Sequence, residues 1–556
     1  MRTETKYIAI TLSAAIFFMA GIHASAQTNE LKKEVQVVRP YEPSISDANK
    51  INFQPKIVDT IKVNPNFSYS IVQRPIETYF FPSSLSAARM VSEPLPDLRM
   101  SYMRIGSGNT ALPYAEAYLS SNRNKDYLYG AWVKFFNTNS KLELTNNLKV
   151  KAPASNLDVM AFGKRMFKQK ILLGDIGFIQ NNRTYYGYFF ENPALTPSSD
   201  KQSINRFVAN LEFKTTHKDS ASVNYHVQTN FYHLADRYDL QETMVTGLFN
   251  LNKFFGQEQF GGEIAFTHYG RSNPWGSKNN ALLQIKPWAH FFGNQWHAYA
   301  GLNIIYDANG NVNNTYFFPR AYLSYDIVSH YIIPYVEIDG YVQENSNSQL
   351  LKQNPWLGSN FDTWNSIHKL IVGGGVKGKF SPTVSYHVNA NYSIIDSLGL
   401  MVNTNYDNNN PLFNRFGLLY ENTERTTVKG EIAFEPSKSF QVKLNGAFYQ
   451  YKTQKVSHPW HLPDYEINGF IQYSFRHKLK LYAEAFVVGK RWAKDPNDSP
   501  IRLNEYLDIN LGAEYIYNKR VSIFVYANNI TGAKYQQWYL YPSQRFNVLA
   551  GVSYKL

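Results

Sequence analysis

The chain has 556 residues, a formal net charge of +13, 16% aromatic residues and only 18% charged residues, a combination typical of a surface that lies in a membrane interface and unusual for a large soluble enzyme. Lys and Arg are scattered rather than clustered, so the positive charge predicts no nucleic-acid partner. Cysteine is absent, which excludes disulfides and thiolate metal sites and predicts that no lipoprotein anchor is attached near the N-terminus.

Residues 1–26 have the pattern of a secretory signal peptide. The charged start Met1–Lys6 is followed by an apolar run that reaches Ile22 and by Ala24-Ser25-Ala26, a small-residue cleavage motif. A membrane anchor is the alternative, but the apolar run is short for one. We therefore expect cleavage before Gln27 and export of the remaining chain.

Residues 27–96 differ in composition from the rest of the chain. They contain eight prolines and show no sustained hydrophobic periodicity. Proline at this density favours extended segments over a packed domain. We expect an extended N-terminal segment that lies in the periplasm or fills the lumen of the following domain.

From residue 97 to residue 556 the chain shows repeated two-faced segments. Residues 465–475 and 507–515 place apolar side chains at every second position. Alternation over about ten residues predicts a tilted strand that crosses a bilayer. We therefore interpret residues 97–556 as an all-β domain whose strands span a membrane.

Connections of two lengths alternate along this domain. Short turns are expected near 254–256, 292–294 and 476–478, for example, and longer polar connections are expected near 138–156, 190–203, 234–240, 271–279, 307–315, 345–365, 397–415, 452–463, 492–502 and 530–540. This arrangement predicts a transmembrane antiparallel β-barrel of about 22 strands, with a range of 18–22. A soluble sandwich or propeller would have shorter strands. Closure is expected because an open sheet edge has no hydrogen-bond partner in lipid.

Two segments carry a resemblance to a known family. Asn528–Tyr535, Trp538, Tyr541-Pro542 and Arg545–Tyr554 resemble the last two strands of TonB-dependent receptors. Gly106–Glu116 resembles the opening strands of shorter members from Gram-negative bacteria. The resemblance implies an outer-membrane barrel that is surrounded by outer-membrane lipids and takes up a solute. Only about 70 residues precede the barrel after the signal peptide, so we expect a short member that lacks the usual globular plug.

The C-terminal strand is predicted to close the barrel against a first strand near residues 99–105. Its apolar face, which should contact lipid, includes Phe546, Val548, Val552, Tyr554 and Leu556. The resemblance implies that the barrel assembly machinery reads this strand as its insertion signal.

A TonB box is a short apolar stretch that pairs with TonB by strand addition. Val35, Val37 and Val38, within Glu34–Val38, have a suitable position near the expected mature N-terminus. Five residues of this texture also occur by chance, which is the alternative interpretation.

No motif predicts catalysis, a cofactor or a metal site. The chain contains neither H-E-x-x-H nor G-x-S-x-G. Asp307–Asn314 places oxygen ligands at alternate positions around a glycine, as calcium loops do, but no closing glutamate follows. A plain Asn/Gly turn is therefore favoured there, and we expect a protein that is not an enzyme.

Pro-Trp recurs in three predicted outer loops and places Trp275, Trp356 and Trp460 there. These residues could form rigid aromatic contacts for a sugar, a hydrophobic ligand or a partner protein. The alternative is the outer aromatic girdle, in which tryptophan lies at headgroup depth.

Two functions remain open at this stage. One is solute uptake across the outer membrane, by a porin-like or receptor-like barrel that acts alone or as the barrel subunit of an uptake complex. The other is a non-transporting scaffold or assembly component that binds other outer-membrane proteins or surface lipoproteins.

Overall fold

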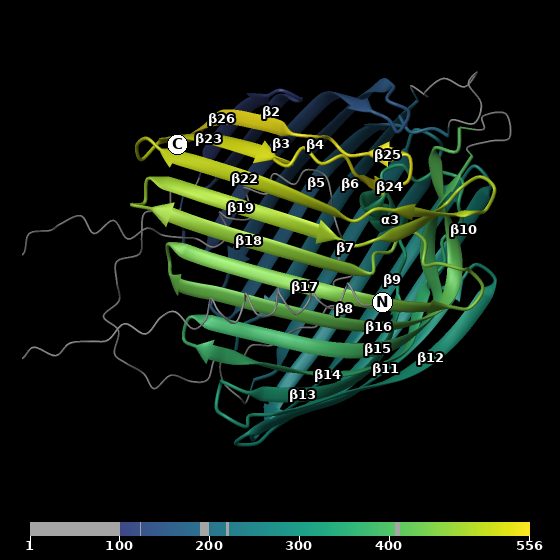
Figure 1. Cartoon of the computed structure of the whole chain (residues 1–556). Helices are drawn as coiled ribbons and strands as arrows, with labels where there is room; N and C mark the ends of the chain where they lie inside the picture. Colours follow the sequence, from purple (N-terminus) through teal and green to yellow (C-terminus); the bar gives the residue numbers. More distant parts are fainter. Residues whose placement is uncertain (1–100, 123, 190–199, 218–221, 406–411) are drawn as a thin grey trace, which may run out of the picture. The chain divides into compact units, whose positions relative to one another are not determined.

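The computed structural model describes residues 101–556, apart from residues 123, 190–199, 218–221 and 406–411 (Figure 1). The expected signal peptide, the segment 27–96 and the TonB-box candidates Val35, Val37 and Val38 lie outside the described residues. Among the described residues, no helix is both long enough and apolar enough for a membrane span.

The described chain forms a single large sheet of 22 strands. The first eleven are β1 (Tyr102–Gly108), β2 (Ala111–Ser120), β3 (Tyr127–Glu143), β4 (Lys149–Met166), β5 (Lys170–Thr184), β6 (Lys201–Thr215), β7 (Asn224–Asp236), β8 (Gln241–Phe255), β9 (Glu258–Asn273), β10 (Gly276–Phe292) and β11 (Trp296–Asn309). The other eleven are β12 (Val312–Tyr325), β13 (Ile333–Gln343), β14 (Ser366–Ser381), β15 (Val384–Thr404), β16 (Arg415–Ser437), β17 (Phe440–Thr453), β18 (Tyr465–Phe475), β19 (Leu479–Val488), β22 (Tyr506–Ile516), β23 (Val521–Asn528) and β26 (Asn547–Lys555). The connections contain α3 (Asn347–Gln353), β20 (Arg491–Lys494), β21 (Pro500–Leu503), β24 (Gln536–Trp538) and β25 (Tyr541–Pro542).

The sheet closes on itself. Each barrel strand pairs antiparallel with the next one in the chain, with β19 followed by β22 and β23 by β26. The ring is completed by β26 and β1, whose register runs from Tyr102 opposite Lys555 to Gly108 opposite Leu549. The predicted all-β antiparallel barrel of 22 strands is confirmed.

Side-chain alternation explains why these segments form barrel strands. In β22, Leu507, Leu511 and Tyr515 are exposed on the outer face, whereas Asp508 and Glu514 are buried on the inner face. An apolar exterior and a polar interior are the two faces that a transmembrane barrel needs, because lipid lies outside and water or polar groups lie inside.

The last strand has the same two faces. Phe546, Val552, Tyr554 and Leu556 are exposed, and Val548 is half-buried. Leu549 and Ser553, which alternate with them, are buried. The apolar set therefore lies on the outer face of the barrel beside β1.

The two ends of the barrel differ. Figure 1 shows tight hairpin turns and the C-terminus at the left, and longer connections with α3, β24 and β25 at the right. Short turns are periplasmic in outer-membrane barrels, so the end with α3 is the outer end.

Four of the expected long connections are wrong, because the observed connections are short. β3 and β4 are joined by residues 144–148, β7 and β8 by 237–240, β9 and β10 by 274–275, and β11 and β12 by 310–311. These strands continue past the point where the apolar face stops, because a ladder of backbone hydrogen bonds remains favourable with water on both sides. Sequence alternation disappears there, although the strand itself does not.

Candidate functional site: an aromatic cap above a polar lumen

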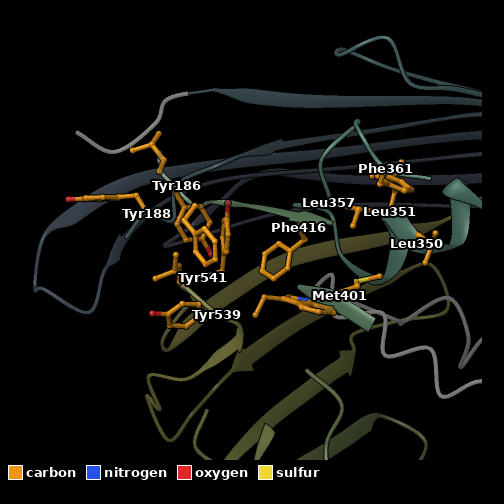
Figure 2. Packing of buried hydrophobic residues seen from close by; sticks show 14 of the residues in the cluster. Tyr186, Tyr188, Leu350, Leu351, Leu357, Phe361, Met401, Phe416, Tyr539 and Tyr541 are labelled. Atoms are coloured by element: carbon orange, nitrogen blue, oxygen red, sulfur yellow. The ribbon is translucent and has the colours of Figure 1, made fainter. Parts of the chain in front are cut away.

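Several outer connections fold together into a buried cluster, which we call the cap. It consists of the segments 185–189, 344–365, 412–416 and 535–543, packed on the outer ends of the strands (Figure 2). The segment 456–463 joins them through the ring of His461, which contacts the rings of Phe416 and Trp538. Members of this cluster include Tyr186, Leu357, Phe416 and Tyr541, all of them buried. The cap therefore has a hydrophobic core of its own, at the outer end of the barrel.

Stacked aromatic rings form the centre of the cap. The rings of Trp356 and Tyr541 are stacked with centroids 4.2 Å apart, and Tyr186 meets Tyr541 edge-on at 4.9 Å. Phe416 contacts Trp538 with ring centroids 5.4 Å apart. Such pairs contribute about 0.5–1.5 kcal/mol each beyond the burial of their area.

Hydrogen bonds satisfy the backbone that the cap buries. The Gly358 N–H donates to the Phe416 carbonyl at 2.8 Å, and the Phe416 N–H donates to the Trp356 carbonyl at 3.1 Å. The Tyr186 hydroxyl donates to the carbonyl of Pro542 at 3.0 Å. Buried backbone N–H and C=O groups cost free energy when they have no hydrogen-bond partner. These bonds offset that cost where the connections fold inward over the barrel.

His461 connects strand β15 with the cap segment 535–543 through its two ring nitrogens. Its Nδ1 lies 2.8 Å from the carbonyl of Met401, and the N–H of Tyr539 donates to Nε2 at 3.3 Å. Burial lowers the pKa of His461 to about 3, so the imidazole is neutral at physiological pH. The neutral ring can donate from one nitrogen and accept at the other, as this geometry requires.

A buried carboxylate attaches α3 to the barrel wall. Glu242, on β8, is fully buried and accepts hydrogen bonds from the backbone N–H groups of Asn347 at 2.9 Å and Ser348 at 3.1 Å. It also pairs with Arg271 Nε at 2.7 Å, and the Tyr232 hydroxyl donates to it at 2.6 Å. Four donors therefore converge on this carboxylate, which compensates for its burial.

Arg271, the partner of Glu242, also hydrogen-bonds to the segment that precedes α3. Arg271 Nη2 donates to the carbonyl of Asn345 at 3.1 Å, and the Tyr269 hydroxyl donates to Glu344 at 2.9 Å. Residues 344–348, which lead into the first turn of α3, are thus fixed to the neighbouring strands β8 and β9.

Replacing Glu242 by Gln should loosen the cap. The change leaves Arg271 buried without its counter-charge, at a cost of roughly 3–5 kcal/mol. We expect trypsin to cleave after Lys352, in α3, on intact cells that carry the variant and much more slowly on wild-type cells. Glu263→Gln is the matched control, because Glu263 pairs with Lys286 at 2.9 Å and both side chains are about one quarter exposed. Equal cleavage of wild type and Glu242→Gln would contradict the anchoring role.

Below the cap lies a cavity of about 1690 Å³ inside the barrel, with polar and apolar side chains in its lining. Inward side chains of the wall line it together with the underside of the cap, where Gln349, Lys352 and Trp538 lie. Its wall carries both acidic and basic groups, such as Glu263 and Lys286. The lumen can therefore accommodate a polar solute.

The three tryptophans of the Pro-Trp motifs have different environments. Trp275 is 68% exposed in the β9–β10 turn, whereas Trp460 is 3% exposed and forms a backbone bridge with Trp492. Trp356 packs in the cap, and its Nε1 donates to the carbonyl of Thr184 at 3.1 Å. Only Trp275 is freely exposed, and Trp356 and Trp460 are packing residues in this structure.

The calcium-like segment forms part of the β11–β12 hairpin. Gly310 has a φ of +64°, as a tight turn requires, and both carboxylate oxygens of Asp307 accept from Asn365 Nδ2 at 3.1 Å. Across the described residues, no group of three or more His, Cys, Asp or Glu side chains is arranged to hold a metal ion.

Glu242, Arg271 and the cap as a whole were not predicted from the sequence. The apolar content of one connection could have indicated the cap. Residues 345–365 contain Leu350, Leu351, Trp356, Leu357 and Phe361. Five large apolar residues in a connection indicate that it packs against something.

Comparison with known proteins finds similarity in structure but not in sequence. No protein-family model and no curated protein sequence matches the chain. The pyoverdine outer membrane receptor FpvA from Pseudomonas aeruginosa matches with a TM-score of 0.60 and 11% identity, over 82% of this chain and 78% of that one. The ferric-catecholate import receptor Fiu from E. coli matches with a TM-score of 0.60 and 10% identity, over 82% and 81%. The copper transporter OprC matches with a TM-score of 0.62 and 8% identity, over 82% and 80%.

Identities this low establish the fold alone. The closed barrel of 22 strands is the barrel fold of TonB-dependent outer-membrane receptors, as the resemblance of the terminal strands indicated. A closed barrel with an apolar exterior satisfies its backbone inside lipid, and the outer membrane is the site of this protein.

Proposed function

We propose that this protein takes up a polar solute through its barrel, alone or as the barrel subunit of an uptake complex. The observation that carries the proposal is the cavity of about 1690 Å³ beneath the cap, whose lining includes charged side chains of both signs. A scaffold that only held partners would need neither a solvated lumen nor a packed structure across its outer end.

Barrel size supports the same function. Barrels of 16–18 strands already leave an aqueous channel, and barrels of 22 strands need an obstruction in the lumen to avoid leakage. The cap supplies one constriction at the outer end. We further propose that residues 27–96 supply a second one inside the lumen, and that Val35, Val37 and Val38 engage TonB.

The structural neighbours agree with uptake as the general role. Their names describe a pyoverdine receptor, a ferric-catecholate import receptor and a copper transporter. Trp275, exposed at the outer end, is a suitable contact for a surface lipoprotein or another subunit of an uptake complex.

Deleting residues 27–96 should raise the conductance of the purified barrel in planar bilayers, because an obstruction of the lumen is lost. The signal peptide is retained so that the protein is still exported. Full-length protein reconstituted at the same density is the control. Unchanged conductance, together with a partner protein recovered in fixed ratio from solubilised membranes, would favour a scaffold over uptake.

A further inference from the structure

One sector of the cavity lining, formed by the barrel wall and an outer connection, carries several cationic side chains. It is formed by Arg425 and Lys429 on β16, Arg491 on β20, and Tyr449 and Tyr451 on β17, all of which line the cavity. We call these five residues the basic patch.

The strand register brings the β16 and β17 members together on one face. Arg425 is directly opposite Tyr451, and the rings of Tyr449 and Tyr451 are stacked with centroids 6.1 Å apart. The alternate residues Val428 and Phe448 are exposed on the outer face of the barrel. Cationic and aromatic groups therefore face the lumen side by side.

Arg491 is a buried cation with unused donors. Its side chain is 2% exposed, and Nη2 donates to the carbonyl of Asn504 at 2.9 Å. Among the described residues, its Nε and Nη1 atoms have no hydrogen-bond partner, and Arg425 Nε is in the same state. Leaving buried donors of a charged group unpaired is costly, so a partner of opposite charge would be stabilised here.

A carboxylate lies beside the basic patch. Glu466, on β18, also lines the cavity and hydrogen-bonds with Tyr449. Arg425 and Arg491 keep guanidinium N–H groups without hydrogen-bond partners among the described residues, although Glu466 is present. His461, at the adjacent edge of the cap, is neutral and adds no charge.

We propose that the basic patch binds an oxyanion group, a carboxylate or a phosphate, of the solute that occupies the lumen. Arginine presents a planar fork of N–H donors that matches both groups, and such hydrogen bonds are about twice as strong as neutral ones. The tyrosines add flat faces and hydroxyl donors beside the forks. The proposal rests on the proposed uptake function, because it names the solute class of the same lumen.

The position under the cap strengthens such binding. The cap restricts water on the outer side, and a lower local dielectric increases the attraction between the arginines and an anion. An anionic solute would therefore pause at this patch after it passes the cap.

Binding can be measured at equilibrium on the purified full chain in detergent, by titration calorimetry with citrate and with inorganic phosphate as separate probes. We expect one of the two anions to bind, and Arg425→Gln to weaken it at least about tenfold, because a charge-assisted hydrogen bond is lost. Arg491→Lys keeps the charge but loses the fork, so it should also weaken binding. The probe that binds tells whether the group is a carboxylate or a phosphate.

Lys286→Gln is the control, because this lumen lysine pairs with Glu263 on the β9–β10 wall and should affect affinity less than about twofold. Heat-modifiable migration in gels verifies that each variant is a folded barrel. Equal weakening by Arg425→Gln and Lys286→Gln would overturn the proposal, as would no binding of either anion to the full chain or to the chain without residues 27–96. If the protein binds the anion but transports no solute, the proposed uptake function is contradicted and the proposed anion site is not.

Discussion

Deleting Tyr554–Leu556 is expected to abolish assembly of the barrel. The deletion removes the pairing of Tyr102 with Lys555 and of Met103 with Tyr554, which close the ring at its periplasmic end. It also removes the hydrogen bond from the Leu556 N–H to the Ser101 carbonyl, at 2.9 Å. Two strands of a barrel then keep unpaired backbone groups at the membrane, each of which costs several kcal/mol in lipid.

The closing pair of strands, β26 and β1, has little room for an alternative register. A Cβ atom on Gly551 would lie 2.1 Å from the Ile105 carbonyl oxygen and 2.5 Å from the Phe524 ring. Shifting β26 by one residue would bring Val552 to this position, and its outward apolar set would face the lumen. We therefore expect the shortened strand to fail rather than slip.

Outer-membrane fractionation with heat-modifiable migration measures this effect. Leu556→Asp should reduce assembly as well, because Leu556 is exposed on the apolar outer face and belongs to the proposed insertion signal. Lys555→Ala is the control on the other face of the strand. Normal outer-membrane levels of the deletion variant would refute the role of this strand.

Replacing residues 345–365 by a short turn, in the chain that lacks residues 27–96, is expected to give a wide pore. The replacement removes α3, Trp356, Leu357 and Phe361 from the cap, and with them the stacking partner of Tyr541. The barrel wall should persist, because its strands pair with one another and not through this connection. Conductance in planar bilayers and sensitivity of cells to large antibiotics should both exceed those of the chain that lacks only residues 27–96.

Shortening the β20–β21 hairpin tip at 496–498 is the matched control, because this turn is exposed and contributes nothing to the aromatic centre of the cap. The control should conduct like its parent. A loop-replaced barrel that conducts no better than its parent would show that the cap is no barrier to solutes.

The barrel itself could be predicted from local pattern. In β22, the apolar residues Leu507, Leu511 and Tyr515 alternate with the polar residues Asp508 and Glu514. The sequence of one such strand is enough to assign its lipid-facing and lumen-facing side chains, whatever strands lie beside it. Strand number and closure follow, since every such strand needs two partners in lipid. The lengths of β3, β4 and β9–β12 could not be predicted, because strands that emerge into water lose the apolar face that marks them.

What the sequence alone determined was therefore the part of the protein that the membrane constrains, including the lipid-facing terminal strand. The tertiary structure decided the cap and the basic patch. Glu242 holds Asn347, and Trp356 stacks on Tyr541, across separations in the chain that carry no local pattern. Such contacts arise only after ring closure brings the outer connections together over the lumen, because burial of their apolar side chains then outweighs the cost of ordering them.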